Sequence, residues 1–329
     1  MKKRLESMVP DGAKSVWFGT FHSICVRILR REARYLPVDS NFTIYDVDDQ
    51  VALIKTIVKD LNLNDKLYRA GTIQETISRA KNEMIMPGQY NIRTSRDAKI
   101  QEIYERYQAG LRASNAMDFD DLLLAALYLL NEREEVRQYY ASRFEHVLID
   151  EFQDTNQIQY ELVRMLSSEH KNLFVVGDED QSIYRWRGAD YRNVLRFEED
   201  YNDFRKILLE QNYRSTQNVL DIARAVIDQN LHRTPKALFT DRGHGNLIRF
   251  YNAEDDRDEA DYVVRTIHAE IRKGVNPASF AIMYRMNSQS RMLEEAFMKA
   301  GIPYRLVGAQ RFYGRSEERR VGKECRSRW

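Results

Sequence analysis

Apolar residues recur at helical spacing from about Ile24 to Ser142. A period of about 3.6 residues predicts amphipathic helices, because it gathers apolar side chains on one face. Pro37, Gly71 and Pro87 mark breaks between these segments. We therefore expect a helical region whose clearest helices are ICVRILRREARYL (24–36), DDQVALIKTIVKDLNL (48–63), TIQETISRAKNEM (72–84) and FDDLLLAALYLLNE (119–132).

The pattern changes at His146 to short apolar runs with a helical segment in each gap. The runs HVLID (146–150), NLFVVGD (172–178) and RKILLEQ (205–211) are far enough apart for the helical crossovers of a parallel sheet. A polar connector, 232–246, is followed by a second alternation of strands and helices. We expect strands at 247–251, 280–285 and 304–308, with helices at 254–273 and 288–300. Two α/β units are thus predicted in one chain.

Asp150 and Glu151 follow the first of these strands directly. Open α/β sheets bind ligands at the carboxyl edge of their strands. There one carboxylate can hold magnesium, while its neighbour orients and deprotonates the water that attacks a γ-phosphate. An ordinary acidic surface turn is the alternative reading of the same pair.

The second strand ends in VVGDEDQSIYRWRGAD (175–190), where Gly177 permits a tight turn. Gln181 then falls beside the first acidic pair if the strands are neighbours, and can sense a phosphate or the attacking water. Tyr184, Trp186 and Arg187 form a mixture that suits stacked bases. The alternative for Trp186 is a place in a buried core.

Two further segments carry candidate chemistry. Tyr213 can stack on a nucleobase, and Arg214 stands before a predicted helix, where an arginine can offset charge on a transferring phosphoryl group. Thr20 and Ser23, on either side of His22, offer hydroxyls for phosphodiester contacts, and helix capping explains them equally well. Taken alone, Arg214 also reads as an ordinary surface residue.

The composition argues against a membrane or secreted protein, but it does not show whether the protein binds nucleic acid. The 329 residues are 43% hydrophobic and 31% charged, no apolar run approaches the roughly 20 residues of a membrane span, and no signal peptide is evident, so we expect a cytoplasmic protein. Cys25 and Cys325 have no spacing that suggests zinc or a disulfide. A net charge of +1 leaves a nucleic-acid partner undecided.

Taken together, several motifs resemble those of superfamily-1 DNA helicases of the UvrD/PcrA type. They occur in family order, as TFHS (20–23), FDDLL (119–123), LIDEFQDTN (148–156), VGDEDQSIYRWRGAD (176–190), LEQNYRS (209–215) and YRMNSQSRMLEEAF (284–297). The resemblance implies an ATP-driven motor that moves 3′ to 5′ on single-stranded DNA, unwinds duplex, and acts in repair or replication with accessory proteins.

The resemblance also implies roles for individual residues. Asp150 would contact Mg²⁺, Glu151 would serve as general base, and Gln181 would couple the γ-phosphate of ATP to DNA. Tyr213 would stack on adenine and Arg214 would reach the γ-phosphate. The DNA-binding positions that it implies are Thr20, Phe21, His22, Phe119, Tyr184, Trp186, Arg187, Arg285 and Asn287.

The fold that this resemblance implies is α/β, with an incomplete RecA-like parallel sheet, an inserted all-helical subdomain and part of a second RecA-like domain. The first RecA-like domain would comprise 1–23 and 145–212, and the helical insertion 24–144. The second RecA-like domain would begin at 213 and run to 313. Residues 314–329 form an irregular basic tail, which we interpret as disordered or foreign.

The chain contains no phosphate-binding motif of the form G-x-x-x-x-G-K-[ST]. In the resembled family this loop precedes TFHS, so we expect the chain to be an internal fragment that does not hydrolyse ATP by itself. Two other hypotheses remain: a module that only binds single-stranded DNA, and a metal-dependent nuclease built on Asp150, Glu151, Asp154, Asp178 and Asp180.

Overall fold

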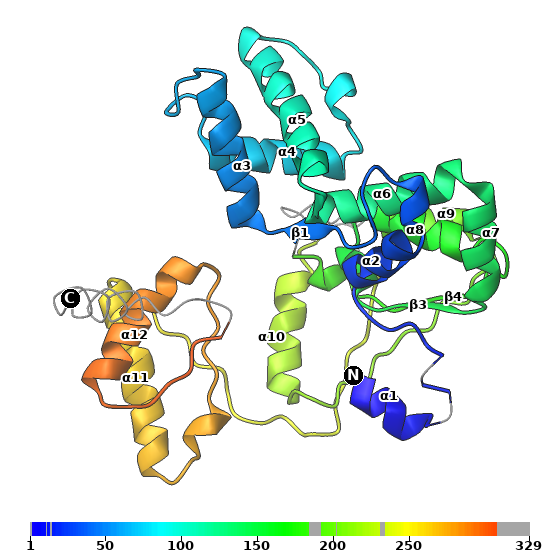
Figure 1. The fold of residues 1–329 in the computed structure, drawn as a ribbon. Coiled ribbons are helices and arrows are strands. Elements are labelled where there is room, and N and C mark those ends of the chain that lie inside the picture. Colours follow the sequence, from blue (N-terminus) through cyan, green and yellow to red (C-terminus); the bar gives the residue numbers. More distant parts are fainter. Residues whose placement is uncertain are drawn as a thin grey trace. The chain divides into compact units, whose positions relative to one another are not determined.

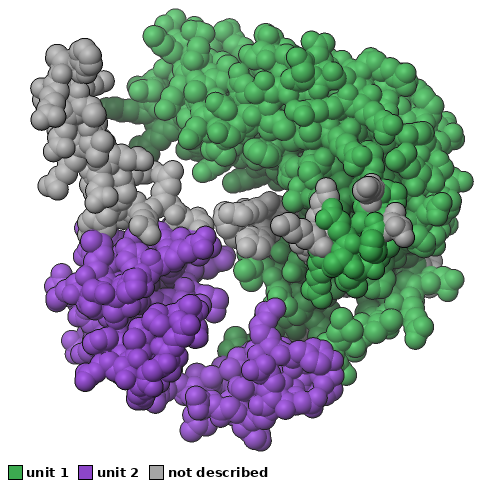
Figure 2. Space-filling view, turned by 60° about the horizontal axis from the view of Figure 1, so that its bottom comes forward, with its two compact units in different colours: residues 1–210, 224–238 green, residues 211–223, 239–329 purple. Residues whose placement is uncertain are grey.

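The computed structural model describes residues 2–10, 12–13, 15–183, 192–201, 203–230 and 234–307 (Figure 1). Two compact units divide the chain, residues 1–210 with 224–238 and residues 211–223 with 239–329 (Figure 2). We call them unit 1 and unit 2. Parallel strand pairs lie among many helices in unit 1, so the described fold is of the mixed α/β class.

The described helices begin and end as follows: α1 Lys2–Met8, α2 Phe21–Arg31, α3 Val47–Asp60, α4 Ala70–Asn82, α5 Ser95–Ala113, α6 Phe119–Glu132, α7 Glu134–Arg143, α8 Gln157–Leu166, α9 Arg192–Asp200, α10 Gln217–Ile227, α11 Asp256–Arg272 and α12 Ser290–Lys299. Short 3₁₀ turns occur at η1 Ala33–Tyr35, η2 Pro87–Gln89, η3 Phe152–Asp154, η4 Glu179–Gln181, η6 Pro277–Ser279 and η7 Asn287–Gln289. The strands are β1 Thr43–Tyr45, β2 Ala116–Asp118, β3 Val147–Ile149 and β4 Leu173–Val175.

Side chains at the helix starts explain several of these boundaries. At α6 the Asp118 carboxylate accepts the backbone N–H of Asp121, and the Asp121 carboxylate accepts that of Asp118. The same reciprocal capping box begins α3, α5 and α8. Each box satisfies donors that the first helical turn leaves without partners, which fixes where the helix begins.

The helices of unit 1 pack into two separate large cores. One core joins α2, α6, α7 and α8 through buried residues such as Ile28, Leu122, Tyr140 and Ile158. The other joins α3, α4 and α5 around Ile54, and β2 contributes to its edge. Helices of the predicted segment 24–144 therefore contribute to both cores.

The predicted strands of the first α/β unit are confirmed for two of three segments. β3 and β4 pair in parallel, with Val147 opposite Leu173 and Ile149 opposite Val175. One face of this pair packs on Phe152, Tyr160 and Phe197, while Leu148 and Phe174 on the other face are exposed.

The strand predicted at 205–211 is wrong, and so are those at 247–251 and 280–285 and, over its described part, at 304–308. In the described chain these segments form no ladder, and Gln211 makes only an isolated bridge to Phe239. Several of their apolar side chains are exposed; Leu209, Phe250 and Met283 are 78%, 91% and 93% accessible. A local apolar run favours a strand, but a strand forms only where a neighbour pairs with its backbone.

Unit 2 has a small core of its own. Helices α11 and α12 pack through Ala260, Val264 and Phe297, in agreement with the helices predicted at 254–273 and 288–300. Within the part of the chain that the structure describes, no helix combines the length and apolar character needed to cross a membrane.

Candidate functional site

The loops that follow β3 and β4 start at the same edge of the sheet, because the two strands run parallel. The backbone ties them together beyond the ladder. The Val176 N–H donates to the Ile149 carbonyl at 2.8 Å, and the Phe152 N–H donates to the Val176 carbonyl at 2.9 Å. This edge carries the acidic pair and Gln181, as the sequence predicted.

Asp150 and Glu151 are both exposed at this edge. The Glu151 backbone is left-handed, with φ 53° and ψ 44°. Residues other than glycine rarely adopt this conformation, and it costs on the order of 1 kcal/mol or more. The Glu151 N–H donates to the Asp150 carboxylate at 3.0 Å, which helps to hold the turn. A strained acidic residue at a strand end is typical of a functional site.

Gln153 connects the two loops through its side-chain amide and is almost completely buried. Its Nε2 donates to the Glu151 carboxylate at 2.8 Å, and its Oε1 accepts the Asp178 N–H at 3.0 Å. A Cβ at Gly177 would lie 2.9 Å from that Oε1, so glycine is needed there for space. The sequence predicted that Gly177 permits a tight turn, whereas the structure shows that glycine makes room for the Gln153 amide.

Asp178 continues this chain of contacts to Gln181. The Gln181 Nε2 donates to the Asp178 carboxylate at 2.8 Å, and the Lys236 ammonium lies 2.5 Å from the same carboxylate. Burial alone would raise the pKa of Asp178, but hydrogen bonds from Lys236 and Gln181 outweigh it and lower that pKa. Glu151, Gln153, Asp178, Gln181 and Lys236 are thus joined in one series of polar contacts, which we call the strand-end network.

Gln153 and Lys236 were not predicted as site residues. Gln153 stands in the same DEFQD run as the acidic pair, so its position two residues after Glu151 was an available signal. Lys236 lies in the predicted connector, 58 residues from Asp178, and no local pattern indicates that contact.

On unit 1, a second group of predicted residues meets where α2 and α6 begin. The His22 and Phe119 rings pack edge to face with centroids 5.7 Å apart. Burial lowers the pKa of His22, which favours a neutral imidazole. Phe119 is 46% exposed, and Phe21 is half-buried against the core of α2 and α6. Thr20 caps α2 by accepting the Ser23 N–H at 3.3 Å, so the capping role is confirmed for that residue.

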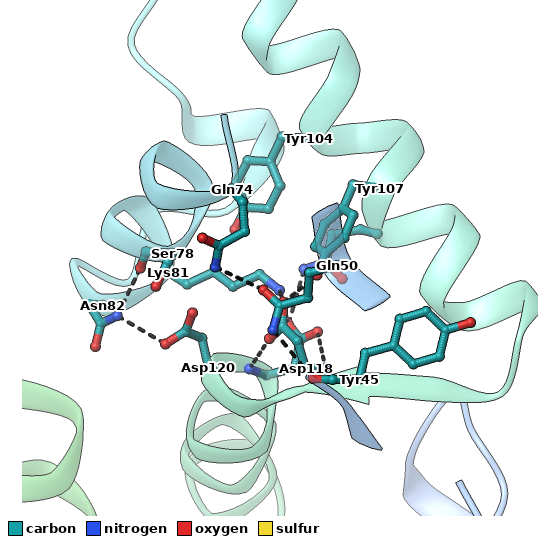
Figure 3. A network of polar contacts seen from close by, with 12 residues as sticks. Tyr45, Gln50, Gln74, Ser78, Lys81, Asn82, Tyr104, Tyr107, Asp118 and Asp120 are labelled. Carbon is teal, nitrogen blue, oxygen red and sulfur yellow. Dashed lines mark hydrogen bonds and ion pairs between the residues drawn. The ribbon is translucent and has the colours of Figure 1, made fainter. Parts of the chain in front are cut away.

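A buried ionic network fixes the start of α6 and with it Phe119. Figure 3 shows Lys81 from α4 and Tyr107 from α5 directed at Asp118. The Lys81 ammonium lies 2.6 Å from Asp118 and 2.7 Å from Asp121, and the Tyr107 hydroxyl donates to Asp118 at 2.8 Å. Burial would lower the pKa of Lys81, but the two carboxylates raise it, so the lysine stays charged. We call this group the Lys81 network.

Four of the predicted residues lie on unit 2. Tyr213 is 75% exposed, and its hydroxyl donates to Gln211 at 2.6 Å. The Asn212 side chain accepts the backbone N–H of Arg214 at 2.9 Å, which shapes the turn before α10. Arg285 and Asn287 are exposed just before α12. The convergence of Arg214 with the strand-end network stays a prediction.

Three predicted DNA-binding residues, Tyr184, Trp186 and Arg187, lie outside the described residues, as does the basic tail. Among the residues that the structure describes, no three His, Cys, Asp or Glu side chains are grouped as metal ligands.

Comparison with known families gives two matches that together span most of the chain. Residues 1–202 match the UvrD/REP helicase N-terminal domain, and residues 207–321 match the UvrD-like helicase C-terminal domain.

Sequence similarity to individual curated proteins agrees with these family matches. The chain is 46% identical over 319 residues to an ATP-dependent DNA helicase PcrA from Staphylococcus epidermidis, and 45% identical to one from Staphylococcus aureus. Each alignment covers 96% of this chain and 44% of the relative, so the chain spans less than half the length of these proteins.

Proposed function

Because the chain belongs to the UvrD/REP helicase family, we propose that it contributes the carboxylate side of a nucleotide site and part of a DNA-binding surface to an ATP-dependent helicase. The proposed motor moves 3′ to 5′ on single-stranded DNA and opens duplex ahead of it, in repair or replication. The strand-end network carries this proposal, since it links the predicted base, Glu151, to the predicted phosphate sensor, Gln181.

The residues at the strand ends fit a magnesium nucleotide. Mg²⁺ keeps several waters and is usually held by one or two carboxylates together with substrate phosphates. Asp150 is exposed at the edge, and one of its oxygens accepts the adjacent Glu151 N–H, so its carboxylate can also take such a ligand. Bound magnesium would supply charge neutralisation on the phosphate oxygens.

Glu151 is the residue that we propose to move a proton. Its carboxylate is open to solvent on one side and is held by the Gln153 amide on the other. A carboxylate oriented in this way can align a water and accept its proton. Gln181 is held by Asp178 at the mouth of the adjacent loop, where it can respond to the γ-phosphate. Tyr213 and Arg214 are proposed to hold the adenine and the γ-phosphate from unit 2.

ATP hydrolysis can be tested by transplanting this chain into the Staphylococcus epidermidis relative in place of the matching segment. We expect DNA-stimulated ATPase activity from the chimera. Glu151→Gln should lower kcat about 10²- to 10⁴-fold, the usual contribution of a general base. Glu169→Gln, an exposed acid before β4, is the matched control. A kcat that Glu151→Gln leaves unchanged contradicts the proposed site.

The DNA side can be tested on the 329-residue chain itself. Phe119→Ala should weaken binding of a fluorescent oligothymidylate about 5- to 100-fold, since each base stack contributes ~1 to 3 kcal/mol. Leu67→Ala, which removes an apolar side chain that is 66% exposed, should leave affinity unchanged. Equal affinities of the two variants in a fluorescence anisotropy titration would remove Phe119 from the DNA-binding surface.

A further inference from the structure

Arginines and aromatic rings alternate along one surface of unit 1, formed by α2, α7 and the segment before α2. The Arg27 guanidinium lies 3.8 Å from the centre of the Trp17 ring, and that of Arg143 lies 5.6 Å from the same ring. Arg143 also donates to the Tyr139 hydroxyl at 3.4 Å, and Arg31 lies 6.0 Å from the Tyr139 ring. We call Trp17, Arg27, Arg31, Tyr139 and Arg143 the arginine–aromatic surface.

Buried contacts beneath hold the rings of this surface in place. Trp17 packs edge to face on Phe144 at 5.2 Å and on Tyr140 at 6.1 Å. Tyr140 is fully buried, and its hydroxyl donates to the Glu32 carboxylate at 3.2 Å. The rings are thus anchored to the core, and the guanidiniums that stack on them lose part of their freedom before any ligand arrives.

The positive charge of this surface is not neutralised locally. Arg27, Arg31 and Arg143 are exposed, and among the described residues no carboxylate lies within ion-pair distance of them. Arg30 adds a further exposed guanidinium on the same face of α2. Each guanidinium carries five N–H donors in a planar fork, which matches the oxygens of a phosphate. Oriented and unpaired arginines of this kind favour a polyanion.

We propose that the arginine–aromatic surface binds the phosphodiester backbone of a nucleic acid, as an extension of the contacts at the start of α2. This inference rests on the proposed function, because the same helix begins at Thr20 and His22. From Ser23 to Arg31 the helix advances roughly 12 Å, which spans about three to four phosphates along one strand of duplex. Backbone contacts of this kind position a strand without reading its sequence.

The same contacts have a purely structural explanation, in which Arg27 and Arg143 only clamp Trp17 to unit 1. That explanation does not account for the contact between Arg31 and Tyr139, because neither residue touches Trp17 in the described contacts. The two explanations differ in whether removal of the charges changes nucleic-acid affinity and its dependence on salt.

The double variant Arg27→Ala/Arg143→Ala tests the proposal. We expect its affinity for nucleic acid to fall at least about 10-fold at 0.1 M salt, and the slope of log K against log salt to shrink by about 1.4 to 1.8. Lys59→Ala/Arg112→Ala removes the same charge from exposed positions of α3 and α5 and should change neither value. Equal losses in both double variants would reduce the effect to net charge and overturn the proposal.

Two probes identify the source of the phosphates, a 30-nucleotide single strand and a blunt 30-base-pair duplex. The probe whose binding falls more in Arg27→Ala/Arg143→Ala is the one that this surface holds. If Phe119→Ala weakens single-strand binding and the arginine pair changes neither probe, the proposed function stands and this inference fails. The reverse result would keep the arginine–aromatic surface and remove Phe119 from the proposed DNA site.

A measurement on the unaltered chain guards against a variant that fails to fold. Phenylglyoxal modifies accessible arginines, and mass spectrometry reports the rate at each position. Saturating oligonucleotide should slow modification of Arg27 and Arg143 several-fold while that of Arg112 is unchanged. Equal rates with and without oligonucleotide at all three positions would contradict the proposal.

Discussion

Unit 1 contains two polar networks built from the same ingredients, a lysine, carboxylates and side-chain amides or hydroxyls, but in opposite surroundings. The Lys81 side chain is completely buried, and its carboxylate partners Asp118 and Asp121 are 2% and 15% exposed. The Lys236 side chain is 15% exposed, and its partner Asp178 is 34% exposed. The strand-end network then ends at Glu151, which is open to solvent.

Because the two networks differ in exposure, they have different roles: the Lys81 network positions a helix, and the strand-end network presents groups that can react. In the Lys81 network the buried polar groups pair with one another, so the group fixes the start of α6. In the strand-end network, Gln153 and Asp178 are internally satisfied while the groups at the two ends, Glu151 and Gln181, are exposed. A buried support with reactive groups at its ends is what a preorganised site requires.

The largest expected effect comes from removal of the buried lysine. Lys81→Met should lower the free energy of unfolding by about 3 to 5 kcal/mol, because Asp118 and Asp121 then remain buried without a counter-charge. Lys236→Met removes the equivalent charge from the partly exposed strand-end network and should cost about 1 kcal/mol or less. Urea denaturation of both variants measures the contrast. Equal losses would mean that burial does not distinguish the two networks.

A smaller effect should appear as a pH dependence around Asp120, which lies beside the Lys81 network. Burial, reinforced by Asp118, raises the pKa of Asp120 to about 6. The folded state therefore holds this proton more tightly than the unfolded state, in which the pKa is about 3.9. The resulting stabilisation is full below about pH 4 and is lost as pH rises through about 6.

Asp120→Asn should remove this dependence. We expect the difference in unfolding free energy between wild type and variant to change by about 2 kcal/mol between pH 4 and pH 7, with the wild type relatively less stable at the higher pH. The amide can still accept the Asn82 Nδ2 hydrogen bond, which is 3.0 Å long in the wild type. Thermal melts of both proteins across this range provide the measurement. A constant difference would contradict the raised pKa.

The local sequence pattern predicted the structure correctly where interactions between residues close in sequence determine it. The helix predicted at 119–132 has those bounds, because its periodic apolar face is preceded by the capping pair Asp118 and Asp121. Likewise β3 and β4 lie within the predicted runs, and their parallel pairing brings Asp150, Glu151 and Gln181 to one edge. That part of the candidate site was therefore accessible from the sequence.

Contacts between residues that are far apart in the sequence could not be predicted from the local pattern. Strands β1 and β2 pair across some 70 residues inside a region predicted to be helical. Lys81 meets Asp118 across 37 residues, and its place in an amphipathic helix gives no sign of burial. The predicted strands 247–251 and 280–285 failed for the converse reason: their local preference is real, but in the described chain no neighbour pairs with them.

The central claim is that the loops after β3 and β4 act as one unit through Gln153. A double-mutant cycle of Gln153→Ala and Gln181→Ala, read as kcat of the chimera, tests it most directly. If Gln153 holds both loops, Gln181→Ala should cost about 10-fold in the wild-type background and less than about threefold once Gln153 is alanine. If the two losses simply multiply, the loops act independently and the claim is wrong.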